Sequence, residues 1–214
     1  EKEACWAQNV YAVSYLAEAC QTVDAFLVHV STDFIFDGAD GPYKEEATAN
    51  PLSFYGWSKL AAEHILLHSS VRWSIARTVL VYGIAHDMSR SNIILWVKKS
   101  LEEGKTIRVV TDQWRTPTLA EDLAVGCQLI ADQRAEGIFN ISGEELLTPY
   151  EMAQQTAAFF GLDATLIQEA DGSTFQQTAK RPARTGFDLT KSKAVLGYTP
   201  RSFREGIALL ASQL

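Results

Sequence analysis

The chain has 214 residues with 19 basic and 26 acidic side chains, which gives a formal net charge of -7. Hydrophobic residues make up 47% and charged residues 21%, the balance of a globular protein with one or two domains. Since there is no apolar stretch long enough for a transmembrane helix, no secretory signal and no long basic run, we expect neither a membrane nor a nucleic acid as partner.

The first residues predict a helix followed by a strand. Apolar residues recur near a 3.6-residue period over residues 3–20, which is typical of a helix. The apolar run 25–30 predicts a strand buried on both faces, as in a parallel sheet. Because an open α/β sheet normally starts with a strand, we expect a cropped chain or a fragment.

Helices and strands continue to alternate along the rest of the chain. Helices are predicted over residues 54–69, 92–103, 118–131, 148–160, 190–196 and 202–213, and strands over 73–82, 107–110, 137–142 and 164–168. Three helices are expected to start with a Ser/Thr-x-x-Glu capping box, at Thr118, Thr148 and Ser202. The pattern predicts an α/β fold with a parallel sheet in the first half, and a smaller lobe after residue 143.

Cysteine and histidine spacing argues against disulfides and metal. The cysteines are Cys5, Cys20 and Cys127, and their odd number and wide spacing predict inert thiols in a reducing cytoplasm. The histidines, at positions 29, 64, 68 and 86, do not have the spacing of metal ligands. His64 and His68 lie four residues apart on a predicted helix, where we expect a surface pair.

Tyr55 and Lys59 are the first candidates for chemistry. They lie four residues apart on the predicted helix 54–69 and therefore on one face of it. An ammonium near a phenol favours the phenolate, so Lys59 is expected to lower the Tyr55 pKa and make the tyrosine a proton donor or acceptor near neutral pH. Tyr-x-x-x-Lys is common by chance, so the pair needs support from its surroundings.

That support comes from Ser31, Thr32 and Asp33, which follow the predicted strand 25–30. Open α/β sheets bind ligands at the carboxyl ends of their strands. A hydroxyl there can hydrogen-bond the carbonyl oxygen that Tyr55 would protonate. The same three residues would equally suit a turn or a helix cap.

Several segments in order resemble the extended short-chain dehydrogenase/reductase family, and its dTDP-4-dehydrorhamnose reductase branch in particular. The segments are STDFIFDG (31–38), GPYKEEATANPLSFYGWSKLAAE (41–63), RTVLVYG (77–83), DQWRTPT (112–118), EDLA (121–124), GIFNISG (137–143) and KRP (180–182). The resemblance implies a Rossmann-like, doubly wound parallel sheet with a smaller α+β substrate lobe. Residues 1–142 would be the remainder of the dinucleotide-binding domain, with part of the lobe inserted around 84–117. Residues 143–214 would form mainly the C-terminal substrate-binding lobe.

The resemblance also implies roles for single residues. Tyr55 would be the catalytic acid/base, Lys59 would hold the nicotinamide ribose, and Thr32 would orient the substrate carbonyl. The other residues implied at the cofactor, NADPH or NADH, are Ser31, Asn9, Val79 and Leu80. The substrate, a nucleotide sugar or a similar carbonyl compound, would meet Thr32, Asp33, Leu80, Trp114 and Arg115. Analogy with the family suggests a homodimer. Arg181 would help to fix a loop over the cleft or would meet a phosphate.

Departures from the family pattern leave two functions open. The glycine-rich fingerprint G-x-x-G-x-x-G is absent, and Leu80 stands where the branch has a tryptophan. The Asp-Glu pair of the related dehydratases is absent too, since Phe34 follows Asp33. Reduction of a 4-keto sugar nucleotide is therefore the first hypothesis. The alternative is a non-catalytic, NADP-binding regulatory subunit, like the beta subunit of methionine adenosyltransferase, which belongs to the same branch and also lacks the tryptophan.

Overall fold

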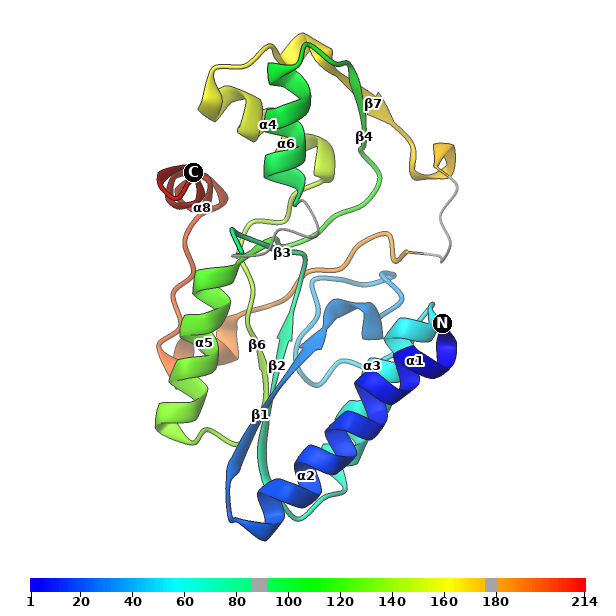
Figure 1. Cartoon of the computed structure of the whole chain (residues 1–214), viewed down its shortest axis with the longest axis vertical. Coiled ribbons are helices and arrows are strands. Elements are labelled where there is room, and N and C mark those ends of the chain that lie inside the picture. The colour runs from blue at the N-terminus through cyan, green and yellow to red at the C-terminus, as the bar shows by residue number, and fades with distance from the viewer. Residues whose placement is uncertain (86–91, 176–180) are drawn as a thin grey trace.

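A three-stranded parallel sheet in the order β1-β2-β6 lies at the centre of the lower part of the molecule in Figure 1. The strands are β1 (Phe26–Thr32), β2 (Arg72–Thr78) and β6 (Gly137–Asn140). Their register pairs Thr32 with Thr78 and Arg77 with Asn140, so the carboxyl ends of all three strands lie at one edge. The structure is a computed structural model that describes residues 1–85, 92–175 and 181–214.

Helices cover both faces of this sheet, which confirms the α/β fold expected from the sequence. On one face of the sheet, α2 (Ala12–Thr22) and α3 (Phe54–Leu67) contact β1. On the other face lie α5 (Ala120–Gln133) and α7 (Thr190–Leu196) (Figure 1). Neighbouring residues of β2 serve the two faces, because Ile75 packs in a cluster with Leu66 of α3 while Ala76 packs in one with Ile130 of α5. Burial on both faces explains the apolar run of β2. The same prediction is wrong for the run 25–30, because β1 lies at the end of the strand order, its residues 26–29 are only half-buried and Val30 is 41% exposed.

The N-terminal helix is interrupted where the sequence predicts one continuous helix over 3–20. It consists of α1 (Lys2–Trp6), a π-helical turn (Ala7–Tyr11) and α2. The π turn contains Asn9, one of the residues implied at the cofactor. Such turns occur mostly as single insertions in α-helices and are frequent at functional sites.

The strand predicted over 73–82 is in fact two strands. β2 ends at Thr78, and β3 (Val81–Tyr82) pairs with β5 (Thr118–Leu119). Leu80 lies between the two strands with a φ of 34°, which turns the chain away from the sheet.

The capping prediction at Thr118 is wrong, whereas those at Thr148 and Ser202 are confirmed. Thr118 lies in β5, where its hydroxyl donates to the Val79 carbonyl at 2.6 Å, and α5 begins only at Ala120. Thr148 and Ser202 each accept a bond from the backbone three residues on, in complete capping boxes.

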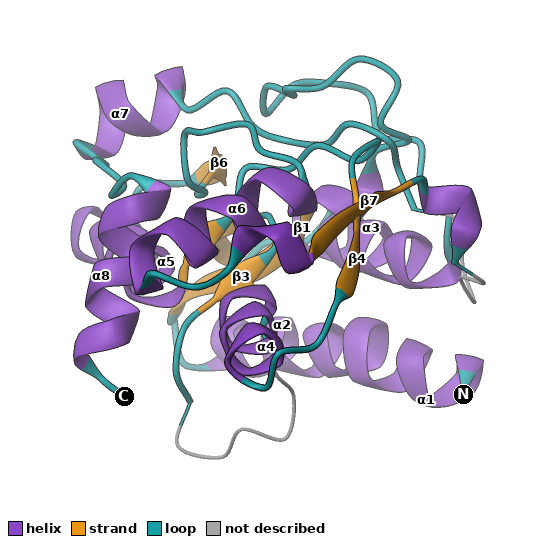
Figure 2. Cartoon of the chain, turned by 90° about the horizontal axis from the view of Figure 1, so that it is seen from above, coloured by secondary structure: helices purple, strands orange, loops and turns teal. Residues whose placement is uncertain are grey.

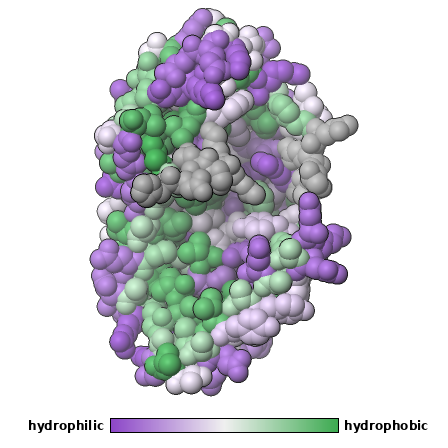
Figure 3. Space-filling model, viewed as in Figure 1, coloured by the Kyte–Doolittle hydropathy of each residue, from purple (hydrophilic) through white to green (hydrophobic). Residues whose placement is uncertain are grey.

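The upper part of the molecule has its own small sheet and its own apolar clusters (Figures 1 and 2). β4 (Ile107–Val110) pairs in parallel with β7 (Ile167–Ala170), which begins three residues after the start of the predicted strand 164–168. α4 (Ile93–Glu102) and α6 (Pro149–Phe160) pack on this sheet, and α8 (Phe203–Ser212) packs on these two helices. The surface is hollowed at the level where the upper and lower parts meet (Figure 3).

The chain after residue 143 contributes to both parts. α6, β7 and α8 lie in the upper part, whereas Phe187 and Tyr198 pack in the same cluster as Phe139 of the central sheet. Within the described ranges, no helix is long and apolar enough to cross a membrane. His86 and Lys180 lie outside the described residues.

Candidate active site at the edge of the sheet

Thr32 and Tyr55 lie together at the carboxyl edge of the central sheet. Thr32 is the last residue of β1, and Tyr55 is in the first turn of α3, which Ser53 caps by accepting from the Gly56 N–H at 3.1 Å. The Thr32 hydroxyl is close enough to the Tyr55 phenol to influence the pKa of that phenol. The turn after β1 packs closely on α3, because a Cβ at Gly56 would lie 2.2 Å from the Phe34 carbonyl oxygen. The fold therefore brings together two residues that are distant from each other along the chain.

The structure contradicts the expectation that Lys59 lowers the Tyr55 pKa. Partial withdrawal of the phenol from water raises the pKa of Tyr55 above its usual value near 10, and the negative charge of Asp33 adds to this shift. The nearby Thr32 hydroxyl opposes it. Since the Tyr55 residue is still 43% exposed, its phenol is a protonated group within reach of a ligand from solvent.

Lys59 reaches β1 instead of the phenol. Its ammonium donates to the Val30 carbonyl at 2.8 Å and lies 3.3 Å from Nε2 of His29. Burial and, to a smaller extent, the Lys59 charge lower the His29 pKa to about 4, so the imidazole is neutral and can accept this bond. Burial also lowers the Lys59 pKa, while Glu63 opposes that shift.

Asn9 lies beside the same helix. Its amide donates to the Ser58 hydroxyl at 2.9 Å and approaches the Cys5 sulfur at 3.4 Å. Ser58 in turn donates to the Tyr55 backbone carbonyl at 2.7 Å. Asn9 therefore fixes α3 near the Tyr55–Lys59 face through Ser58, and the structure shows no direct Asn9–Lys59 bond among the described residues.

The Ser31 side chain points into the protein, and the cofactor contact implied for this residue stays a prediction. Its hydroxyl donates at 2.5 Å to Glu63, a carboxylate that is 0% exposed. Glu63 also accepts two bonds from Arg77, at 3.1 and 2.7 Å. The sequence analysis did not single out Glu63. Its place four residues after Lys59, on the same helical face, is the signal that could have found it.

Asp33 and Arg115 are both buried, and the sugar contact implied for them stays a prediction. The Asp33 carboxylate is 3% exposed and accepts from the hydroxyls of Thr32, at 3.1 Å, and Thr185. Arg115 lies 3.9 Å from it and donates to the Pro182 carbonyl at 2.7 Å. Burial raises the Asp33 pKa, an effect that the neighbouring Arg115 charge and the hydroxyl bonds oppose. Both side chains therefore bind the 182–185 segment.

Val79 is also buried, and its backbone carbonyl accepts a hydrogen bond from the Thr118 hydroxyl. The Val79 carbonyl oxygen is therefore already bonded within the protein. Leu80, the next residue, is exposed and lines a cavity of about 510 Å³. Trp114 is half-exposed, but it does not line this cavity; its backbone pairs with the strand-like segment at Ala183 and Thr185. Its neighbour Gln113 lines the cavity instead.

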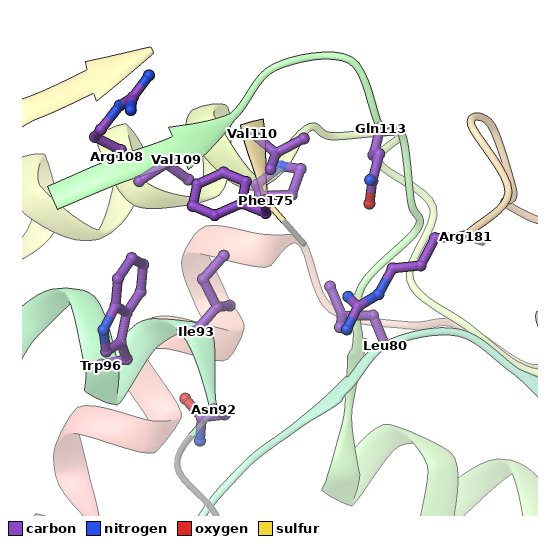
Figure 4. A pocket seen from close by; sticks show the side chains of 11 residues that line it. Leu80, Asn92, Ile93, Trp96, Arg108, Val109, Val110, Gln113, Phe175 and Arg181 are labelled. Carbon is purple, nitrogen blue, oxygen red and sulfur yellow. The ribbon is translucent and has the colours of Figure 1, made fainter. Parts of the chain in front are cut away.

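The cavity combines aromatic surface with positive charge (Figure 4). The full lining consists of Leu80, Asn92, Ile93, Trp96, Arg108, Val109, Val110, Gln113, Pro149, Phe175 and Arg181. In Figure 4, Arg181 reaches in from the side opposite to Trp96 and Arg108, and the ring of Phe175 lies between them. Among these described lining residues there are two arginines and no carboxylate. The cavity therefore suits an anionic ligand with a flat apolar portion.

The fold and the position of these residues at the sheet edge define a Rossmann-like protein of the dehydrogenase/reductase class. The family model described as the RmlD substrate binding domain matches residues 1–214, and the chain belongs to this family. This finding confirms the resemblance seen in the sequence.

Solved structures of similar proteins support the same assignment. The dTDP-4-dehydrorhamnose reductase of Bacillus anthracis, solved in complex with NADP, has a TM-score of 0.88 at 25% identity, over 96% of this chain and 72% of that one. A hypothetical dTDP-4-dehydrorhamnose reductase from Sulfolobus tokodaii has a TM-score of 0.83 at 30% identity, over 96% of this chain and 71% of that one.

Two similar sequences have different names. The methionine adenosyltransferase 2 subunit beta of Bos taurus is 32% identical over 205 residues, which cover 93% of this chain and 61% of the bovine protein. A probable low-salt glycan biosynthesis reductase of Haloferax volcanii is 31% identical over 210 residues, which cover 97% of this chain and 70% of that protein. The chain thus spans about three fifths of the length of the bovine subunit.

Proposed function

We propose that this chain carries the carbonyl-reducing site of an NAD(P)H-dependent reductase that acts on a 4-keto sugar nucleotide. The observation that carries the proposal is the placement of Thr32 at the end of β1 and Tyr55 at the start of α3, close enough for the Thr32 hydroxyl to influence the Tyr55 pKa, with Lys59 one helical turn further on the same face. The solved NADP complex of a family member and the similarity to a glycan biosynthesis reductase support it.

The donors at this edge fit the nicotinamide ribose. Lys59 has three N–H bonds, of which Val30 and His29 account for two, and the third can donate to a ribose hydroxyl. The Tyr55 phenol is exposed beside it. The sequence contains no G-x-x-G-x-x-G turn for the pyrophosphate, so the fit concerns the nicotinamide end of the cofactor.

Each side chain then has a defined task in reduction. Tyr55, protonated because its pKa is raised, donates its proton to the carbonyl oxygen. Thr32 exchanges its bond to Asp33 for a bond to the same oxygen and stabilises the charge that develops there. Lys59 holds the ribose with the N–H bond that His29 and Val30 leave unused. The bound nicotinamide supplies the hydride.

We propose the cavity behind Leu80 as the place of the nucleotide portion of the substrate. Arg181 and Arg108 supply positive charge for phosphates, and the faces of Trp96 and Phe175 supply a surface for a base. Leu80 links this cavity with the sheet edge, because it follows β2 by two residues.

The decisive experiment uses the full-length protein and Tyr55→Phe. NAD(P)H oxidation is followed spectroscopically with dTDP-4-keto sugars, and cofactor binding is followed by fluorescence. Loss of the proton donor should reduce kcat by a factor on the order of 10² to 10⁴, with cofactor affinity and unfolding free energy nearly unchanged. Tyr15→Phe, at an exposed tyrosine of α2, is the matched control and should keep full activity. A Tyr55→Phe variant with the wild-type rate would overturn the assignment.

The similarity to the methionine adenosyltransferase subunit favours a second function, that of a regulatory protein that binds NADP without turnover. Saturable cofactor binding with no oxidation of NAD(P)H across the panel of carbonyl substrates would support it and reject the reductase. For either function we propose a cytoplasmic location, which the three unpaired thiols support. The homodimer stays a prediction.

A further inference from the structure

Glu63 is a buried carboxylate that the proposed reaction does not use. It is 0% exposed and accepts three bonds, one from the Ser31 hydroxyl at 2.5 Å and two from Arg77 at 3.1 and 2.7 Å. Charge-assisted bonds of this kind are short and strong, and the two bonds from Arg77 form a planar fork with fixed geometry. Glu63 is therefore held rigidly in the space between α3 and the sheet.

The partners of Glu63 are the immediate neighbours of the site residues. Ser31 directly precedes Thr32 on β1, and the register places Ser31 opposite Arg77 on β2. On α3, Glu63 lies one turn after Lys59 and two turns after Tyr55. One carboxylate therefore joins the helix that carries two site residues to the strand end that carries the third.

Further bonds extend this connection to the third strand. Arg77 donates to the Glu45 carbonyl at 2.8 Å, and the Glu45 carboxylate accepts from the Asn140 backbone N–H of β6 at 3.0 Å. Glu45, Arg77 and Asn140 are all buried. Through these groups, Glu63 ties the carboxyl ends of β1, β2 and β6 to α3.

Stability alone does not account for such a pair. Buried ion pairs can often be replaced by apolar residues without loss of stability, because desolvation offsets much of the attraction. Apolar contacts between α3 and the sheet are already present in the cluster of Ala62, Leu66 and Ile75. What directional bonds add is a fixed geometry, and reacting groups need placement to within about 0.5 Å.

We propose that Glu63 is a positioning residue of the reduction site, which through Ser31 and Arg77 fixes Thr32 against the helix that carries Tyr55 and Lys59. The proposal rests on the proposed function, since it assigns Glu63 to the same site. It gives the buried pair a measurable consequence for turnover beyond its effect on folding.

Glu63 also acts on Lys59 through its charge. The titratable and charged groups that face Lys59 are His29 of β1, which is neutral, and Tyr55 and Glu63 of α3, with Arg77 of β2 behind Glu63. Glu63 raises the Lys59 pKa against the lowering that burial causes. Neutralising Glu63 should therefore lower the Lys59 pKa further.

The first test is Ser31→Ala, which leaves the Glu63–Arg77 pair in place, with Ser74→Ala as its control. Ser74 is a fully buried serine of β2 whose hydroxyl donates to the Gly137 carbonyl at 2.9 Å, on the same sheet. Ser31→Ala should lower kcat by about 10- to 100-fold with KM for the carbonyl substrate nearly unchanged, because the reacting groups are displaced. Ser74→Ala should lose comparable stability without this loss of kcat. Equal kcat values in the two variants would overturn the proposal.

The second test does not depend on turnover. Glu63→Gln keeps an acceptor for Ser31 but removes the charge. Competitive acetylation with acetic anhydride, read by mass spectrometry over a pH series, measures the titration of Lys59 against exposed Lys99 in the same molecule. In Glu63→Gln the Lys59 midpoint should move to lower pH while that of Lys99 stays. An unchanged Lys59 midpoint in a folded variant would overturn the electrostatic action of Glu63 on Lys59.

The two arms separate failure of this inference from failure of the proposed function. If the wild-type protein reduces no carbonyl substrate, the proposed function fails, and the acetylation result alone decides whether Glu63 acts on Lys59. If the wild type is active and Ser31→Ala matches Ser74→Ala, the reductase stands and the positioning role is rejected.

Discussion

The sheet edge and the cavity behind Leu80 are built from different interactions. At the sheet edge, buried polar groups hold one another, as in the Ser31–Glu63–Arg77 bonds. Around the cavity, apolar and aromatic residues such as Trp96 and Phe175 form the walls, and the arginines are at the rim. The comparison teaches that fixed geometry for chemistry and surface for recognition come from separate parts of this fold. Substitutions in the two regions should therefore have different signatures.

Arg77→Met should have the largest effect. It leaves the Glu63 carboxylate buried without its partner, which typically costs about 3–5 kcal/mol of unfolding free energy. Urea denaturation measures the change. Arg72→Met is the control, because its ion pair with Asp24 is on the surface and is worth about 0–1 kcal/mol. Similar losses of unfolding free energy in both variants would show that the polar network does not stabilise the sheet edge.

Gly56→Ala should have the next largest effect. The new methyl group would lie 2.2 Å from the Phe34 carbonyl oxygen, so α3 must move away from the turn that follows β1. Overpacking of this kind costs about 1–3 kcal/mol, although alanine favours a helix more than glycine does. We expect lower unfolding free energy together with lower kcat, since Tyr55 is the neighbouring residue.

The control for Gly56→Ala is His64→Ala, an exposed change on the same helix. It should leave both quantities nearly unchanged. If Gly56→Ala is more stable than the wild type and fully active, the close approach of α3 to the Phe34 carbonyl does not constrain the site.

Arg181→Ala sharpens the comparison from the cavity side. Loss of one charge-assisted contact should weaken binding of a nucleoside diphosphate about tenfold, measured by calorimetry, with unfolding free energy unchanged. Arg184→Ala is the matched control, because Arg184 is exposed on the same segment but does not line the cavity. Equal affinities of the two variants would exclude Arg181 as a phosphate contact.

Asp33→Asn should have the smallest effect, a change in how stability depends on pH. Burial raises the Asp33 pKa, so the folded protein binds this proton more tightly than the unfolded chain. The stability that the proton contributes is present below the ordinary pKa of about 3.9 and is lost as pH rises through the raised value. Unfolding free energies of both proteins over this pH range should show the wild type losing stability relative to the variant. A constant difference would contradict the raised pKa.

Local features of the structure followed from the sequence where neighbouring residues decide them. The caps at Thr148 and Ser202, the surface pair of His64 and His68, and a strand at residues 25–30, which extends to Thr32 in the structure, depend on nearby residues alone. The prediction failed at Thr118, because a partner distant in sequence, the Val79 carbonyl, takes its hydroxyl.

The sequence predicted which residues would gather at the candidate site, but it did not predict which way their side chains would point. The sequence indicated that Thr32, Tyr55 and Lys59 would lie together, because helical spacing and strand ends follow general rules. It could not show that Asp33 and Ser31 turn inward, since their partners Thr185 and Glu63 are 152 and 32 residues away in the chain. Buried polar partners of this kind are set by tertiary contacts and not by local pattern.

The π turn at Ala7–Tyr11 changes the direction in which the side chains of the N-terminal helix point, so the parts before and after the turn face different surfaces. One extra residue rotates everything beyond it by about 100° relative to an uninterrupted α-helix. Ahead of the turn, Cys5 faces Ser58; beyond it, Val13 and Ala17 face the apolar layer over the sheet. Removing a single residue from this turn would restore a regular α-helix. The helix could then no longer keep both its polar contact at Ser58 and its apolar contacts over the sheet.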